Sequence, residues 1–449
     1  YSHNYGVESY LARINYGFKS RYYIDASWRT DGSSRFHPSD RWGHFWSVGA
    51  SWRISEEQFM ENTRQWLDNL TLKVSYGVQG NDNLGTYYAW QGLYDYTWPN
   101  ATDAGAFVDK LENRKVTWEK NGNLNAGIEA TMFGGRLGVS VEYYNRKTRD
   151  MLLNSPLPIS TGFTGFNDNV GSLRNQGLEV SLRGTILDKR DFRWDATLMG
   201  SFNRNKVLSL TGGQDVITSG IRVIEVGRPI YTFYLPKTAG VDPATGKQLY
   251  YAYWTQTVND EGALVNTRCD EYITDNVAMA TLSKYYHESR EPKLFGSIGS
   301  TFTILKNIDV SFLTTYSIGG WVYDGLYNGS MYVQYAGNNW HKNAKRRWQK
   351  PGDKTDVPML EVGGSYATAS NSLIDASYFA IKNITVGYTL PKRWLKKIDI
   401  ESLRIYATLD NIAMFNHMDG MDPQYNFTGS VAYSYTPSRV IAFGIDLNF

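Results

Sequence analysis

The last stretch of the chain, 438–449, alternates between apolar side chains and polar or small ones. The apolar side chains occupy every second position: Ile441, Phe443, Ile445, Leu447 and Phe449. A period of two residues is typical of an extended strand with one apolar face. A soluble sheet gains little from a last strand that ends on an unpaired aromatic residue. The closing strand of a transmembrane β-barrel does gain, because its aromatic end lies at the membrane interface.

The same alternation recurs along the chain and predicts about 13 amphipathic strands. Most of these segments are about 10 residues long, the length that a tilted strand needs to cross a bilayer. They are residues 8–18, 22–29, 46–54, 70–78, 124–132, 137–143, 178–182, 192–198, 294–305, 308–316, 384–388, 403–409 and 441–449. The pattern therefore predicts an all-β protein.

The connections between these strands alternate between short and long. The short ones are 19–21, 54–69, 133–136, 188–191, 306–307 and 391–401, and the two longest are 205–291 and 319–376. A meandering barrel with short periplasmic turns and long extracellular loops predicts this alternation. A sandwich with Greek-key connections does not, because its topology does not place every long loop at one end. We therefore expect an antiparallel transmembrane β-barrel.

Three further expectations concern the connections and the strand count. The segment 56–67 (EEQFMENTRQWL) is compatible with a short helix, and 205–291 shows no regular alternation. Single-chain bacterial barrels have even numbers of strands, whereas the count here is odd. Because an unpaired strand edge is costly in lipid, we expect further strands upstream of Tyr1.

Composition argues against several other classes of protein. Mean hydropathy is −0.43, and no run approaches the roughly 18 apolar residues of a spanning helix. With a net charge of +2, capture of nucleic acid is not expected to be the main role. The single cysteine, Cys269, allows no disulfide within the chain and indicates no zinc site. No metalloprotease, hydrolase or Cys/His motif is present, so we expect neither an enzyme nor a metal or other cofactor.

Aromatic and amide residues gather in three of the long loops, and we take them as candidate substrate contacts. They are Trp90, Tyr94, Tyr96 and Trp98; Trp321, Tyr323, Asn338, Asn339 and Trp340; and Tyr425. Aromatic faces stack on sugar rings or on peptide and apolar groups, and side-chain amides bond to hydroxyls. The same residues would also serve to pack the loops together or to form the membrane girdle. Both interpretations stay open.

Several short words of the sequence carry a family resemblance. They include RTDGSSRF (29–36), WRISEE (52–57), KVSYG (73–77), WEK (118–120), NQGLE (175–179), IKNITVGYTLP (381–391) and LRIY (403–406). In these words and in their order, the chain resembles the C-terminal half of a SusC/RagA-type TonB-dependent transporter of Bacteroidota. The resemblance covers nearly the whole chain.

The resemblance implies a barrel of about 22 strands. Residues 1–449 would be its C-terminal part, and roughly nine strands and a plug domain would precede Tyr1. It implies TonB-dependent import of a large nutrient, an oligosaccharide or a peptide, across the cell outer membrane beneath a SusD-like surface lipoprotein. Some members carry a calcium-binding word that 250–271 lacks, which again predicts no metal.

The resemblance also implies several other partners. These are the TonB complex, acting through the plug, the barrel-assembly machinery, lipid and lipopolysaccharide, and the upstream part of the same barrel. A dimer of transporter–lipoprotein pairs is compatible with it. The assembly machinery would recognise the closing strand through Phe443, Ile445, Leu447 and Phe449. Two alternatives are kept: a passive porin, and a surface adhesin or glycan-binding β-protein that transports nothing.

Overall fold

The computed structural model describes residues 4–449 with some internal exceptions. These are 100, 104, 211–214, 332–336, 338, 362–363, 365, 397–399, 419–420, 425–427 and 432–434. Among the described helices, none is long and apolar enough to cross a membrane.

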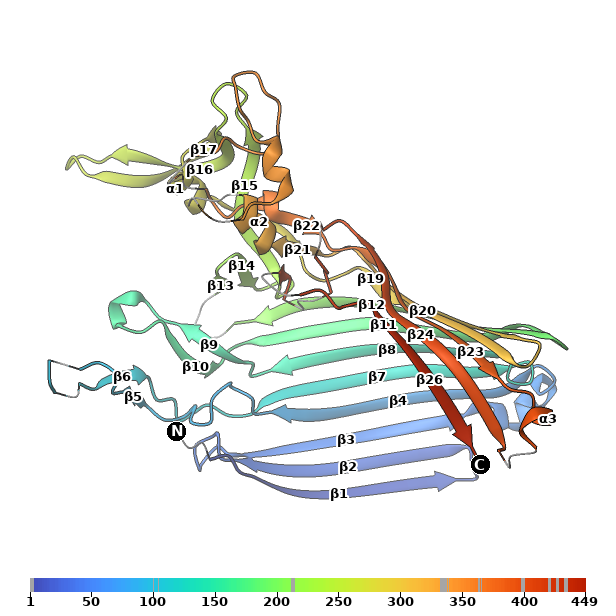
Figure 1. Ribbon diagram of the computed structural model, residues 1–449. Helices are drawn as coiled ribbons and strands as arrows, with labels where there is room; N and C mark the ends of the chain where they lie inside the picture. The colour runs from blue at the N-terminus through green and yellow to red at the C-terminus, as the bar shows by residue number, and fades with distance from the viewer. Residues whose placement is uncertain are drawn as a thin grey trace.

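One antiparallel sheet of 13 strands forms the body of the molecule (Figure 1). Each strand pairs with the sheet strands that precede and follow it along the chain. In order, they are β1 (Val7–Phe18), β2 (Tyr22–Ser33), β3 (Trp42–Arg53), β4 (Leu67–Asn81), β7 (Glu119–Met132), β8 (Leu137–Arg149), β11 (Ser172–Lys189), β12 (Phe192–Ser209), β19 (Leu294–Ile304), β20 (Ile308–Ile318), β23 (Tyr378–Thr389), β24 (Ser402–Asn416) and β26 (Val440–Asn448). The predicted strands and their meandering order are confirmed.

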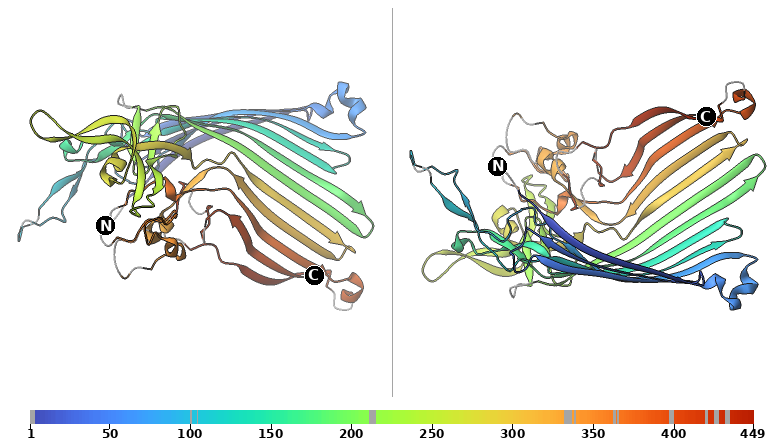
Figure 2. Two further views of the ribbon diagram at one scale, coloured as in Figure 1. Left: turned by 90° about the horizontal axis from the view of Figure 1, so that it is seen from above. Right: turned by 90° about the horizontal axis from the view of Figure 1, so that it is seen from below.

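The two faces of the sheet differ in chemistry because side chains alternate along each strand. Ile128, Val141 and Val180 are successive register partners on β7, β8 and β11, and they belong to the apolar outer face. One position along, Glu142 and Glu179 face each other on the polar inner face. Figure 2 shows the sheet curving like part of a barrel wall, with β1 and β26 at its two edges.

The short connections gather at one end of the sheet, beside the C-terminus (Figure 1). One of them contains α3 (Lys392–Leu395). The connection between β3 and β4, whose sequence is compatible with a short helix, forms two 3₁₀ segments, η1 (Ile54–Glu56) and η2 (Gln58–Thr63). Neither has a side-chain hydrogen bond at its N-cap, and a short segment without a cap does not sustain an α-helix.

The long connections lie at the other end and hold small sheets of their own. β5 (Leu93–Asp95) pairs with β6 (Phe107–Lys110), and β9 (Leu152–Pro156) pairs with β10 (Gly165–Asn169). The largest insertion contains β13 (Val216–Ser219), β14 (Arg222–Glu225), β15 (Thr232–Val241), β16 (Gln248–Val258), β17 (Leu264–Thr274), α1 (Val277–Leu282) and β18 (Lys284–Ser289). The last two connections contain β21 (Trp321–Asp324), α2 (Gly325–Met331), β22 (Leu373–Asp375) and β25 (Ser430–Val431). Short 3₁₀ segments η3 (Ile159–Thr161), η4 (Lys342–Arg346) and η5 (Ser370–Ser372) complete the loops.

The expectation that 205–291 is irregular is therefore wrong. This sheet could not be predicted from alternation, because neighbouring residues of β15 are buried on both faces of the strand. Phe233 and Leu235 of β15 pack with Tyr323 of β21 and Leu373 of β22. Insertions that are far apart in sequence thus share one apolar core and form a common body above the sheet.

Candidate functional site

A recess of about 410 Å³, here called the mouth pocket, lies where the largest insertion joins the inner face of the sheet. It is lined by Tyr144, Asn175, Asn203, Asn205, Pro229, Tyr231, Arg290, Glu291, Pro292, Phe295, Ser317, Tyr378 and Gln424. Those on strands are inward-facing positions of β8, β11, β12, β19, β20 and β23. The pocket therefore opens to the interior side of the wall.

A glycine makes room for one of the rings that line the mouth pocket. Tyr144 on β8 lies opposite Gly177 on β11, and its hydroxyl is 2.5 Å from where a Cβ would stand on that glycine. Any other residue at 177 would push the ring away. From this position the Tyr144 hydroxyl donates to Asn203 Oδ1 at 2.8 Å on the next strand.

A chain of amides and one carboxylate forms the polar side of the mouth pocket. Asn203 Nδ2 donates to the Glu291 carboxylate, and the backbone N–H of Asn205 donates to Glu291 Oε2 at 3.0 Å. Asn205 Nδ2 donates to Asn175 Oδ1 at 2.8 Å, and its Oδ1 accepts from the backbone N–H of Ile230 at 2.8 Å. These bonds tie the wall strands to the insertion that leaves them.

Glu291 and Arg290 are neighbours in sequence, and both are largely buried. Burial raises the pKa of the Glu291 carboxyl, and the bonds from Asn205 and Asn203 oppose that rise only in part. Burial also lowers the pKa of the Arg290 guanidinium, whose Nη2 donates to the Pro423 carbonyl at 2.7 Å. Two ionisable groups thus line a largely apolar recess, a combination that is typical of ligand sites.

The rest of the mouth pocket consists of rings. Tyr144, Tyr231, Phe295 and Tyr378 supply aromatic surface, and Pro229 and Pro292 supply flat aliphatic surface. The side chains of Asn175, Asn203 and Asn205 already bond to one another, to Tyr144 or to Glu291, and Gln424 Nε2 donates to Asp422. The pocket therefore offers apolar and ring contact over most of its surface, with polar groups at one side.

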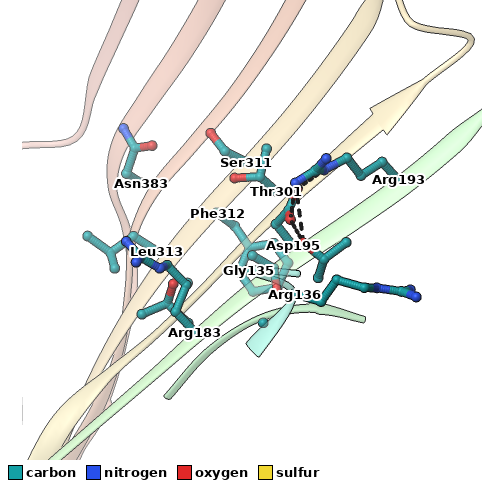
Figure 3. Close-up of a pocket in the computed structure, with 15 residues that line it drawn as sticks. Gly135, Arg136, Arg183, Arg193, Asp195, Thr301, Ser311, Phe312, Leu313 and Asn383 are labelled. Atoms are coloured by element: carbon teal, nitrogen blue, oxygen red, sulfur yellow. Dashed lines mark hydrogen bonds and ion pairs between the residues drawn. The ribbon is translucent and has the colours of Figure 1, made fainter. Parts of the chain in front are cut away.

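A second recess, of about 420 Å³, lies on the same inner wall nearer the short connections. Arg193 donates to Asp195 there, with its Nε 2.7 Å from Oδ2, and Figure 3 shows the pair. Arg183 and Arg136 extend away from that pair in the same view. Thr, Ser and Gly line most of the remainder, so this recess is polar where the mouth pocket is apolar.

A third hollow, of about 680 Å³, lies within the loop sheets and shares Pro229 with the mouth pocket. The Arg228 guanidinium lies 3.7 Å from the Tyr286 ring centroid, and its Nε is 2.6 Å from Glu225 Oε2. Burial lowers the pKa of His287 there. We call it the loop cavity.

The structure distributes the candidate substrate residues over several places. Trp90 packs against the core of Phe36, Phe45, Val116 and Trp118. The other candidates of its loop, Tyr94, Tyr96 and Trp98, are exposed on or beside β5 and β6. Trp321 lines the loop cavity, and Tyr323 is buried in the shared core. Trp340 and Asn339 are exposed, and Asn338 and Tyr425 lie outside the described residues.

None of the candidates that the structure describes lines the mouth pocket, and the residues that do line it were not recognised as a site in the sequence. One signal was available: Tyr144, Phe295 and Tyr378 are aromatic residues on the inward-facing side of amphipathic strands. Glu291 had no such signal, because it precedes β19 and meets Asn203 only after the insertion has folded back.

The sequence and the fold of this barrel wall were compared with those of known proteins. A family model described as "TonB dependent receptor-like, beta-barrel" matches residues 1–412. The chain belongs to that family. Its members are outer-membrane receptors and transporters with a β-barrel, which agrees with the observed sheet and with the expected SusC/RagA resemblance.

Two curated TonB-dependent receptors illustrate the similarity. SusC of Bacteroides thetaiotaomicron is 29% identical over 456 residues, which cover 98% of this chain and 43% of SusC. Receptor P26 of Formosa agariphila is 29% identical over 476 residues, covering 99% of this chain and 46% of P26. The chain thus spans less than half the length of these relatives.

A solved structure of the RagAB peptide transporter is similar in fold as well as in sequence. It superimposes with a TM-score of 0.84 at 30% identity, covering 99% of this chain and 48% of that one. A RagAB peptide importer in a "closed-closed" state gives a TM-score of 0.82, also at 30% identity. The family assignment therefore rests on sequence and on fold together.

Proposed function

We propose that this chain is the C-terminal part of a TonB-dependent importer that moves a large nutrient across the outer membrane. The observation that carries the proposal is the mouth pocket, a recess with rings and buried ionisable groups on the inner face of the family's barrel wall. A ligand that contacts this pocket from the interior side is on a route through the barrel. The proposed importer has no catalytic residues, metal or other cofactor.

The proposed substrate is an oligosaccharide or a peptide, and the mouth pocket favours a peptide with apolar side chains. A sugar carries hydroxyls around its ring, which need free donors and acceptors. Here the three asparagines and Gln424 already bond to other groups of the protein, whereas the rings and prolines remain available for apolar contact. Similarity to a RagAB peptide transporter supports the same choice.

We also propose a SusD-like surface lipoprotein as partner at the loop end. Two hairpins extend from the loops, β5–β6 and β16–β17, and Figure 1 shows both projecting at that end. Trp98 beside β5–β6 is 66% exposed, and Leu264 at the start of β17 is 69% exposed. Exposed apolar groups on projecting ribbons suit contact with another protein.

The remaining parts of the proposal follow the family. The TonB complex would act through a plug domain, and the upstream part of the barrel would complete the wall beside β1 and β26. Phe443, Ile445 and Leu447 point away from the inner face on β26, where Phe443 is 82% exposed, and with Phe449 they would serve as the assembly signal. We propose a multi-pass barrel in the outer membrane, in contact with lipid and lipopolysaccharide, and dimers of transporter–lipoprotein pairs.

The test is uptake in cells that lack the chromosomal gene and carry the full-length protein. Labelled peptides and labelled oligosaccharides of similar size would be supplied, with and without functional TonB. We expect peptide uptake that requires TonB and that falls when Tyr231 and Phe295 are both changed to alanine, at unchanged surface levels. Uptake that persists without TonB would indicate a passive porin. Binding to cells without any uptake would indicate an adhesin or glycan-binding protein.

A further inference from the structure

The connections at the short-turn end segregate their charges. Three of them, β11–β12, β19–β20 and β23–β24, carry cations for which the described residues show no ion pair. These cations, here called the basic arc, are Lys189, Arg190, Lys306, Lys392, Arg393 and Lys396. Among the carboxylates of these connections, Asp188 forms an ion pair with Arg193, its Oδ2 lying 3.9 Å from Nη1. Asp191 and Glu401 are the described carboxylates there that form no ion pair. Positive charge is therefore in excess along this arc.

The three connections of the basic arc are physically continuous. The backbone N–H of Leu305 donates to the Asp191 carbonyl at 2.8 Å, which joins the first connection to the second. The backbone N–H of Thr389 donates to the Asn307 carbonyl at 2.7 Å, and Asn307 Nδ2 returns a bond to the Thr389 carbonyl at 2.7 Å. The cations thus lie along one strip of the rim rather than on separate turns.

The connections on the other half of the rim are nearly balanced in charge. Arg21 pairs with Glu57 at 3.2 Å, Arg53 with Glu56 at 3.2 Å, and Arg64 with Glu61 at 3.9 Å. The excess of positive charge is thus confined to one half of the rim. A general need for solubility would not explain that confinement.

Exposed apolar side chains accompany the cations of the basic arc. Leu395 is buried at 2% exposure and anchors α3, whereas its neighbour Trp394 is 54% exposed and Leu305 in the adjoining turn is 61% exposed. The Arg393 guanidinium lies 5.9 Å from the Trp394 ring centroid. Tryptophan beside cations at the end of a lipid-facing wall is the chemistry of a membrane interface.

We propose that the basic arc binds anionic phospholipid in the periplasmic leaflet of the outer membrane. The phosphates would contact Lys306, Lys392, Arg393 and Lys396, while the acyl chains would contact the exposed side chains of Leu305 and Trp394. Cations near an anionic leaflet each contribute electrostatic attraction, so a strip of them selects charged over zwitterionic headgroups. An acidic protein would also meet the charge but would leave the two apolar side chains without partners. The site rests on the proposed placement of this rim at the periplasmic surface.

The test measures lipid retention by the purified full-length receptor in detergent, using native mass spectrometry. Phosphatidylglycerol and phosphatidylethanolamine would be added in equal amounts. We expect preferential retention of phosphatidylglycerol, reduced about tenfold or more in the K392A/R393A/K396A variant. The matched control K19A/R64A/R136A removes three cations from the balanced half of the rim and should retain the lipid as the wild type does. Heat-dependent gel migration verifies folding of each variant.

Two further arms separate lipid from free phosphate. Trp394→Ala should weaken phosphatidylglycerol retention while the cations remain, because the apolar part of the site is lost. Inorganic phosphate at millimolar concentration should not displace the lipid. The proposal fails if both lipids are retained equally, if the triple variant and its control behave alike, or if phosphate alone displaces the lipid. Because no transport is measured, failure here is distinct from failure of the proposed import function.

Discussion

Arg404 on β24 reaches across β23 to Asp309 on β20, with its Nη2 2.7 Å from Oδ2 and its Nε 3.0 Å from Oδ1. Its Nη1 also lies 3.2 Å from Asp446 Oδ2 on β26. The side chain passes over Gly387, where a Cβ would stand 2.5 Å from Asp309 Oδ1 and 2.6 Å from Arg404 Nε. One arginine therefore ties three strands of the wall together on its inner face.

Gly387→Ala should break this contact and destabilise the C-terminal part of the wall by about 1 to 3 kcal/mol, the usual cost of an overpacked site. The measurement is the temperature at which the purified receptor changes from compact to unfolded migration on a gel. Gly299→Ala is the control, because a Cβ there meets nothing closer than 3.9 Å on the same inner face. Equal transition temperatures for the two variants would show that the Arg404 contact does not stabilise the wall.

Phe295→Ala in the mouth pocket should weaken binding of an apolar peptide about five- to thirtyfold, because a ring that contacts ligand contributes one or two kcal/mol. Calorimetry with the purified receptor measures this affinity. Leu313→Ala is the matched control: it also removes an apolar side chain from the inner wall, but from the polar recess near the short connections. If the control loses as much affinity as Phe295→Ala, the ligand does not select the mouth pocket.

Much of the fold could be predicted because lipid imposes a simple rule on each strand. The outer face must be apolar at every second position, so Phe443, Ile445 and Leu447 mark their strand without knowledge of any neighbour. β15 escaped prediction because its neighbouring residues Phe233 and Thr232 are both buried by other loops. Alternation identifies strands that face two different solvents, and it fails for strands enclosed by protein.

The mouth pocket could not be predicted from the sequence for a related reason. Tyr144 meets Asn203 across 59 positions, and Asn203 meets Glu291 across 88. These contacts depend on strand register and on the path of a long insertion, neither of which local pattern determines. The loop aromatics were easier to notice because they cluster in sequence, and their role as substrate contacts stays a prediction.

Replacement of Tyr94, Tyr96 and Trp98 by serine should reduce recovery of the partner lipoprotein with the receptor. All three side chains are exposed on or beside the projecting β5–β6 hairpin, so their loss removes apolar contact without opening a core. Co-purification from the native host through a tagged receptor gives the measurement. Phe59→Ser is the control, since this exposed aromatic lies among the short connections at the opposite end. Undiminished recovery with the triple variant would exclude this hairpin from the interface.

Glu291 should make the mouth pocket less stable as pH rises. Burial raises its pKa in the folded protein, so its contribution to stability is complete below the ordinary carboxyl pKa and is lost as pH rises through the raised value. Hydrogen exchange of residues 203–207, corrected for intrinsic rates, should therefore show more frequent opening at pH 7.5 than at pH 5. Glu291→Gln, which keeps an acceptor for the Asn205 N–H, should remove this dependence.

Asp275, in the same insertion, has a pKa shifted in the direction opposite to that of Glu291. Lys247 Nζ donates a hydrogen bond to Asp275 Oδ2 at 2.7 Å, which lowers the pKa of the Asp275 carboxyl. The contribution of Asp275 to stability is therefore present above the ordinary carboxyl pKa and is lost as pH falls through the lowered value. Asp275→Asn should leave the rise in exchange at residues 203–207 intact while Glu291→Gln abolishes it. If both variants flatten the profile, the pH dependence belongs to the insertion as a whole and not to the buried carboxyl of the mouth pocket.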